Sequence, residues 1–334
     1  MTRARRFVVV LSILSLTFAA PLATPVNATT LPTWAITVNV KMAQSTVDDQ
    51  GGLVYALSRV STQFDTINHR FNDTGRFKGI VNFRETSFAV YSDMASNEKD
   101  QPHPDSQLQL IYDENQDTGG GWFGGASQTI VHDWDVADGG LFGPNATDGL
   151  VHEFGHSREA TDEYALNVDA TKNPIDGKAY QEPYSIMVYP YGVRTWSDYS
   201  VGLINQAADK VNPAGPALAS GDFPAQLQVK VVNSDGRPLS KAKIALYPVA
   251  WFTYSVAPTP TVSGSTNGAG LYKLSTNPFQ PGSKGSPWDM KYCNFRVKVT
   301  SGAKTGYAWM PLTQVGAKYF SNPNSTYTLT VRTG

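Results

Sequence analysis

The sequence is poor in the residues that mark several common protein classes. Cys293 is the only cysteine among 334 residues, so the chain cannot form an internal disulfide or a cysteine-rich structural zinc site. Charged residues make up 16% of the chain and the formal net charge is −1. Because no basic surplus is present, we expect no nucleic acid among the partners. Cys293 lies in an alternating, strand-like run and is expected to be a small buried side chain.

Long apolar runs are also missing beyond the N-terminal segment. In that segment, three arginines precede a short apolar stretch, 7–20, and a small-residue cleavage site ends at Ala28. The stretch is shorter than the ~20 residues that a membrane-spanning helix needs, which argues against the alternative of a membrane anchor. We interpret residues 1–28 as a secretory signal peptide, and we expect a secreted protein without a membrane span.

The region 29–211 carries the patterns of an α/β sandwich with a mixed sheet. Strand-like segments occur at 34–42, 77–93, 107–114 and 118–136, and the second of these fits one long strand or two. Between the first and the second, a single apolar stripe predicts a helix. Its members are Leu53, Leu57, Val60, Phe64, Ile67 and Phe71.

The segment VHEFGHSREATDEY, residues 151–164, contains the pattern HExxH. His152 and His156 are four residues apart, so on a helix they point the same way and can share one metal ion. Glu153 lies between them in sequence and can take a proton from a metal-bound water. Asp148 is expected to cap this helix. The alternative is an ordinary helix whose two histidines bind no metal.

A second segment, YSIMVYPYG at 184–192, adds to a family resemblance. HEFGHSREATD and SIMVY together resemble the active-site helix and the Met-turn of metzincin-type zinc endopeptidases, over roughly residues 33–211. HEFGHS and DEY are also similar to the IgA-cleaving metallopeptidases of bacteria. The resemblance implies an α+β catalytic domain with a mixed twisted sheet, a backing helix and an active-site helix. It also implies that Met187 forms a hydrophobic floor under the metal and that Tyr189 offers its hydroxyl to the metal or to the tetrahedral intermediate.

The same resemblance makes Asp162 the third zinc ligand, because the metzincin pattern has a ligand ten residues after the first histidine. One departure leaves alternatives open. Glu159 stands where the family has a glycine that lets the helix stop and the chain turn back. If the helix continues instead, Glu159 and Glu163 share the face of the two histidines, and either carboxylate can be the third ligand.

The chain changes character after this region. Thr195 and Asp198 resemble a capping box for a helix over 195–212, and the Pro-, Gly- and Ala-rich segment 212–226 is typical of a linker. Residues 227–334 consist of short alternating stretches between turn signals, which predicts an all-β sandwich. Part of it resembles the transthyretin-like or carboxypeptidase-regulatory-like modules appended to secreted enzymes.

These patterns predict a secreted zinc endopeptidase, with Zn²⁺ as cofactor, Glu153 as general base and a protein or peptide as substrate. An extended peptide is expected to pair with an edge strand in 118–136. The alternative is an exported binding or adhesion protein on a catalytically degenerate protease scaffold. We expect a monomer, and a glycan or cell-surface target is a further option for the C-terminal aromatic residues, namely Trp251, Phe252, Tyr254, Trp288 and Trp309.

Overall fold

The computed structural model describes residues 30–92, 106–113, 120–124, 128–133, 140–210, 223–281 and 290–334. The predicted signal peptide, 1–28, lies outside them, as does most of the predicted linker, 212–226. Within the described ranges, no helix combines the length and the hydrophobicity that crossing a membrane would require.

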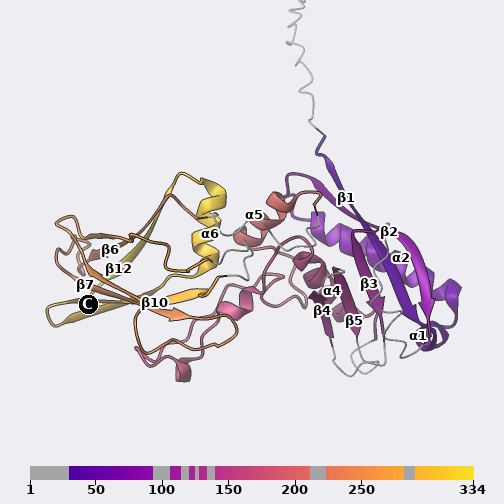
Figure 1. Cartoon of the computed structure of the whole chain (residues 1–334), viewed down its shortest axis with the longest axis horizontal. Helices are drawn as coiled ribbons and strands as arrows, with labels where there is room; N and C mark the ends of the chain where they lie inside the picture. The colour runs from indigo at the N-terminus through magenta and orange to yellow at the C-terminus, as the bar shows by residue number, and fades with distance from the viewer. Residues whose placement is uncertain are drawn as a thin grey trace, which may run out of the picture. The chain divides into compact units, whose positions relative to one another are not determined.

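A five-stranded mixed sheet forms the N-terminal region (Figure 1). Its strands are β1 (Thr33–Ala43), β2 (Ile80–Tyr91), β3 (Leu108–Tyr112), β4 (Gly120–Gly124) and β5 (Thr129–Asp133). They lie in the order β2-β1-β3-β5-β4, and only the edge strand β4 is antiparallel to its neighbour. The predicted mixed sheet is confirmed, and the segment 77–93 contributes one strand rather than two.

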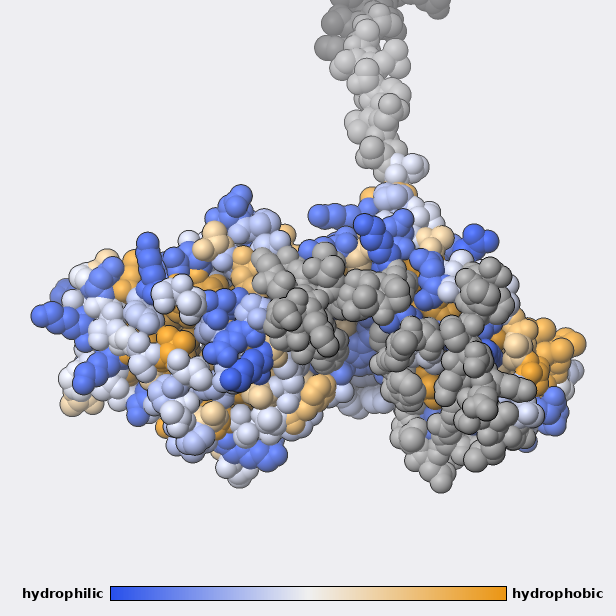
Figure 2. Space-filling view, viewed as in Figure 1, coloured by the Kyte–Doolittle hydropathy of each residue, from blue (hydrophilic) through white to orange (hydrophobic). Residues whose placement is uncertain are grey.

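A short helix, α1 (Gln44–Asp49), precedes the long helix α2 (Leu53–Asn72), which packs on the sheet. Most of its predicted apolar stripe is buried, at Val60, Phe64, Ile67 and Phe71. Leu53 was expected in that stripe but is 46% exposed, because it lies in the first turn, beyond the packed face. With Val54 and Tyr55 it forms an exposed hydrophobic patch at the start of α2, at the right of Figure 2.

Helix α4 (Pro144–His156) holds the HExxH motif against the same core. Its Phe154 ring lies 5.9 Å from the Phe64 ring of α2 and 4.4 Å from the Phe83 ring of β2, both edge-to-face. Such pairs add about 1 kcal/mol each beyond the apolar area that they bury. The motif helix is therefore fixed between the backing helix and the sheet.

The predicted capping role of Asp148 is wrong. Helix α4 begins at Pro144 after the extended residue Gly143, which leaves Asp148 inside the helix. The Asp148 carboxylate is buried, forms an ion pair with Arg70 of α2, and accepts a hydrogen bond from the Gly192 amide at 2.7 Å. This carboxylate therefore joins three separate segments around the motif helix.

Helix α5 (Asp198–Ala207) is shorter than the predicted 195–212. Its N-cap is Ser197, whose hydroxyl oxygen accepts from the Ser200 amide at 2.9 Å, so the predicted Thr195 capping box is displaced by two residues. Between α4 and α5 lie two short 3-10 helices, η2 (Glu163–Leu166) and η3 (Ala170–Lys172).

The C-terminal region is built on two sheets, in the orders β11-β10-β7-β8 and β12-β6-β9. The strands are β6 (Gln226–Val232), β7 (Lys243–Val249), β8 (Val262–Ser265), β9 (Leu271–Lys273), β10 (Asn294–Ser301), β11 (Lys304–Trp309) and β12 (Thr326–Arg332). The all-β prediction misses one element, helix α6 (Leu312–Ser321). This helix buries Leu312 and Val315, three residues apart, which is helical rather than strand spacing. Cys293 is buried as expected.

The sandwich shares its hydrophobic core with the segment after the motif helix and with α5, whereas the sheet, α2 and α4 pack around a separate core. Leu166 at the end of η2, Val168 just after it, and Tyr199 and Leu203 of α5 belong to the same buried cluster as the sandwich side chains. Polar contacts accompany this packing: the buried Asn294 amide donates to the Leu166 carbonyl at 3.1 Å. Residues Pro32–Gly334 accordingly form one unit in which the sandwich supports the segment after the motif helix.

Candidate metal centre

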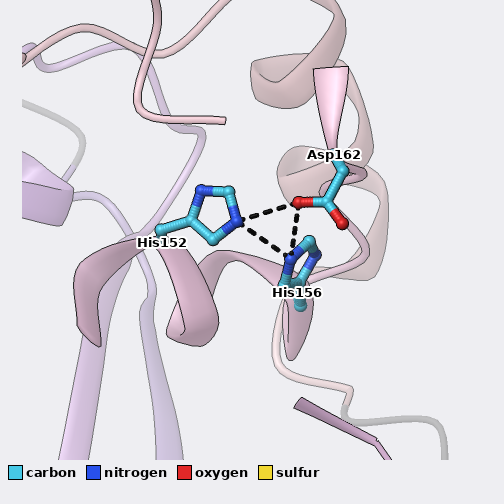
Figure 3. Close-up of side chains that lie close together, drawn as sticks. All are labelled: His152, His156 and Asp162. Atoms are coloured by element: carbon cyan, nitrogen blue, oxygen red, sulfur yellow. Dashed lines mark hydrogen bonds and ion pairs between the residues drawn. The ribbon is translucent and has the colours of Figure 1, made fainter. Parts of the chain in front are cut away.

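Three side chains converge at the end of α4 (Figure 3). Nε2 of His152 lies 3.1 Å from Nε2 of His156, and one Asp162 carboxylate oxygen lies 2.9 Å and 3.2 Å from those two nitrogens. All three residues are largely buried, with side-chain exposures of 8%, 9% and 14%. The structure thus brings together the three residues that the sequence predicts as zinc ligands.

Backbone carbonyls fix the orientation of both imidazole rings. Nδ1 of His152 lies 2.9 Å from the Ile186 carbonyl oxygen, and Nδ1 of His156 lies 2.8 Å from the Ala160 carbonyl oxygen. A carbonyl oxygen only accepts, so each Nδ1 carries the proton and each neutral ring presents an Nε2 lone pair. Metal-binding histidines use the same arrangement, in which the second nitrogen donates to a backbone or carboxylate oxygen.

Two lone pairs and a carboxylate facing one another require a cation between them. Burial opposes a charged imidazole, yet the Asp162 and Glu153 charges raise the pKa of His156 to about 9, so this cluster favours a positive charge. Burial alone would raise the pKa of Asp162, yet the neighbouring histidines lower it well below its usual range. The donor set, two imidazoles and one carboxylate, suits zinc with a fourth position left for water.

The chain reaches Asp162 by turning sharply after the helix. Helix α4 ends at His156, and Glu159 adopts a left-handed conformation with φ of +74°. The Ala160 amide then donates to the Gly155 carbonyl at 3.1 Å, which closes the turn. Glu159 therefore adopts the left-handed geometry for which the metzincin pattern has a glycine, and the alternative of a continuing helix is wrong.

Glu163, the other competing carboxylate, points away from the metal centre. It accepts hydrogen bonds from the hydroxyls of Ser185 and Ser200, both at 2.7 Å, and from Ser197. Burial raises its pKa, while the three hydroxyls act in the opposite direction. Neither Glu163 nor Glu159 contributes an atom to the cluster of three ligands.

Glu153 lies beside the cluster and is 8% exposed. Burial raises the pKa of its carboxyl above the usual value, although the nearby histidines lower it. A carboxylate with a raised pKa accepts a proton more readily than an exposed one, which is the property that a general base requires. The position and the environment of Glu153 both fit the predicted role.

The SIMVY segment forms a turn below the motif helix, as predicted. Met187 is fully buried, and the Val188 and Tyr189 amides both donate to the Ser185 carbonyl. A Cβ placed on Gly155 would lie only 2.9 Å from the Met187 sulfur, so the glycine of HEFGH allows the helix to approach the turn. The Met187 carbonyl also accepts from the Glu163 amide at 3.0 Å, which ties the turn to the segment carrying Asp162.

Tyr189 is 48% exposed, and its ring packs against the rings of Tyr184 and Tyr191. Its predicted role as a hydroxyl donor stays a prediction. A tyrosine that lies beside the described ligands is Tyr164, whose ring stacks on the His152 ring at a centroid distance of 6.3 Å. Burial and the Asp162 charge raise the pKa of Tyr164 well above its usual range, so the hydroxyl stays protonated. The tripeptide DEY was the only sequence signal for this residue.

Comparisons with known proteins do not assign the chain to a family. No protein-family model matches it, and no curated protein does. Among solved structures, it is similar to a chain of a chaperone–substrate complex at 16% identity and TM-score 0.35, over 54% of this chain and 35% of that chain. It is also similar to catechol 1,2-dioxygenase from Acinetobacter sp. ADP1 at 10% identity and TM-score 0.19, over 32% of this chain and 52% of that one. The chain thus spans about a third and about half of these two chains, and both scores are too low to bear on its activity.

Proposed function

We propose that the protein is a secreted zinc endopeptidase. The observation that carries this proposal is the meeting of three acceptor atoms, from His152, His156 and Asp162, beside the buried carboxyl of Glu153. A cation satisfies the acceptors, and a neighbouring base is needed only if a proton is to be moved. A purely structural metal site would have no use for Glu153.

The proposed reaction follows from the positions of these groups. The two Nε2 atoms and the Asp162 carboxylate would hold zinc, which when bound would supply Lewis-acid activation of water and of the scissile carbonyl. Glu153 takes the proton of the attacking water and passes it to the leaving amine. The Tyr164 ring, stacked on the His152 ring, helps to hold that imidazole in place. Strand β4 lies at the open edge of the sheet, where an extended peptide can add as a further strand.

Several features support the endopeptidase over the alternative of a degenerate binding protein. The mixed sheet, the backing helix α2, the motif helix α4 and the Met187 turn all agree with the metzincin resemblance of the sequence. The three proposed ligands converge and the buried carboxyl of Glu153 is retained, which supports a working site over a degenerate one. Export is proposed from the predicted signal peptide.

The test is a comparison of the wild-type protein with Glu153→Gln. We expect about one zinc per chain in both, by metal analysis, because Glu153 is not a ligand. Cleavage of an unstructured protein such as casein should fall by a factor of about 10³ or more in the variant, because the water loses its proton acceptor. Activity within tenfold of the wild type would exclude Glu153 as the base. Zinc binding without any proteolysis by the wild type would favour the binding protein.

A further inference from the structure

A loop of the C-terminal sandwich reaches the metal centre. This segment, residues 250–255, is named here the aromatic loop, and it is closed by a bridge between Val249 and Val256. The Phe252 ring lies edge-to-face on the Tyr164 ring at 5.9 Å. The Tyr164 ring in turn stacks on the His152 ring, so one side chain lies between Phe252 and a proposed zinc ligand.

The aromatic loop holds an unusual backbone conformation. Phe252 and Tyr254 have positive φ values of 58° and 54°, a left-handed geometry that bulky residues rarely adopt. Residues in this conformation are strained and persist only where surrounding contacts hold them. Retaining two of them in one short loop indicates that the position of these side chains matters.

The contacts that hold the loop come from both regions. The Asp169 amide donates to the Tyr254 carbonyl, and the Val256 amide donates to the Lys172 carbonyl, both at 3.0 Å. On the sandwich side, the Trp251 indole donates to the Met290 carbonyl at 3.0 Å. The loop is thus fastened to the segment that follows Asp162, which makes it a fixed part of the metal-site rim.

Phe252 nevertheless remains 44% exposed. A side chain present only for packing would be expected to bury more of its ring, whereas this ring is held open at the rim. The charges nearby are balanced: Lys172 and Asp169 form an exposed ion pair at 3.0 Å, and the Lys172 ammonium lies over the Tyr254 ring at 5.7 Å. The rim therefore offers an apolar aromatic surface without excess charge.

We propose that Phe252 and Tyr164 form an aromatic subsite that binds an apolar side chain of the peptide substrate close to the scissile bond. This inference rests on the proposed endopeptidase function and adds the kind of side chain that it selects. The sandwich is then part of the substrate site rather than a separate binding module. A bulky aromatic or aliphatic side chain would bury the exposed part of the Phe252 ring and gain edge-to-face contacts.

The test uses the full chain loaded with zinc and two matched peptide series. One series carries Phe or Leu near the scissile bond, and the other carries Ala there. In the wild type we expect kcat/KM to favour the apolar series by at least tenfold, as one hydrophobic pocket typically provides. Phe252→Ala and Phe252→Asn should both reduce this ratio about tenfold, and Phe252→Tyr should restore it. Asn tolerates left-handed backbone, so the second variant removes the ring without added strain. Tyr55→Ala, at a 65% exposed position on α2, is the matched control and should leave the ratio unchanged.

A second arm separates this inference from the proposed reaction. In zinc-loaded Glu153→Gln protein, direct binding of the two peptide series is measured with and without Phe252→Asn. The apolar series should bind about tenfold more tightly only when Phe252 is present. An unchanged ratio in both arms would overturn the aromatic subsite even if the enzyme is active. A wild type that cleaves neither series, but whose Glu153→Gln form shows the binding difference, would overturn the reaction and keep the subsite.

Discussion

Asp162 and Glu163 are adjacent in sequence, yet their carboxylates lie in opposite kinds of surroundings. The Asp162 carboxylate faces the Nε2 atoms of His152 and His156, which present lone pairs when their Nδ1 atoms donate elsewhere. Glu163 faces three serine hydroxyls, all of which can donate. Both residues are buried or nearly so, and burial alone would raise both pKa values.

The difference shows which buried carboxylate needs a cation. A carboxylate supplied with hydroxyl donors is satisfied by the protein itself, whereas one placed among acceptors requires a proton or a metal ion. Proximity to the HExxH motif does not distinguish the two residues, because both follow the motif within seven residues of His156. What distinguishes Asp162 from Glu163 is the direction of each side chain, which the left-handed turn at Glu159 sets.

The largest effect is expected on zinc affinity when each carboxylate is removed in turn. Asp162→Ala should weaken zinc binding by a factor of about 10³, since a ligand change exceeds the 10–100-fold typical of supporting residues. Glu163→Gln and Glu159→Ala should change the zinc dissociation constant by less than about threefold, because neither side chain contacts the metal position. Competition with a chromophoric chelator gives all four constants. Equal losses in Asp162→Ala and Glu159→Ala would contradict the ligand set.

Metal removal should also affect the thermal stability of the Asp162 and Glu163 variants differently. With free zinc at about a thousand times its dissociation constant, binding adds about 4 kcal/mol to the free energy of unfolding. A strong chelator should therefore lower the thermal midpoint of the wild type and of Glu163→Gln. In Asp162→Ala, the chelator should have little effect. A midpoint that does not respond to chelator in the wild type would show that the acceptor cluster binds no metal.

A third histidine, buried away from the metal centre, should make the free energy of unfolding depend on pH. His132 of β5 is fully buried and its Nε2 contacts the Leu141 carbonyl at 2.7 Å; burial lowers its pKa from 6.5 to about 4. Between these values the unfolded chain binds more protons, so the stability from neutral His132 is complete above pH 6.5 and is lost as the pH falls towards 4. The loss amounts to about 3 kcal/mol.

Denaturant unfolding of the chelator-treated protein at pH 7 and pH 4.5 measures this loss without the contribution of metal release. His132→Gln is the matched variant, because its amide can still donate to Leu141 but does not titrate. The pH dependence should be shallower in this variant by most of the stated amount. An identical pH dependence in both proteins would show that His132 is not the acid-sensitive group.

The smallest effect is expected for Glu163→Gln in the absence of zinc. A glutamine oxygen can still accept from Ser197 and Ser200, and its amide can donate to the Ser185 hydroxyl, so the unfolding free energy should change by about 1 kcal/mol or less. Chemical denaturation of both proteins in chelator gives the difference. A loss of several kcal/mol would mean that the negative charge of Glu163 itself is needed.

The sequence predicts those parts of the molecule that depend on local periodicity. The strand at 34–42 and the buried part of the apolar stripe of α2 follow from alternation and from helical spacing. The position of His152 and His156 on the same face of the helix follows from their separation of four residues. Helix α6 was missed because it is short and interrupts a run of strands.

The remaining features depend on contacts between distant segments, which periodicity does not encode. Asp148 has the composition of a helix cap, but Arg70, 78 positions earlier, pairs with it inside the fold. Glu159 lacks the intrinsic preference for a left-handed conformation, which the surrounding turn imposes. The contact of Phe252 with Tyr164 joins two regions whose sequences were interpreted as separate domains.

The shared core also has a consequence for biosynthesis. Leu166 and Val168, which follow the metal ligands, become covered only when sandwich residues such as Asn294 and Phe295 are present. About 130 residues separate Asp162 from that strand, which corresponds to roughly ten seconds of translation at typical rates. We therefore expect nascent chains that stop before Asn294 to be open to proteolysis near Leu166. The segment that carries Asp162 would then reach its final packing late in synthesis.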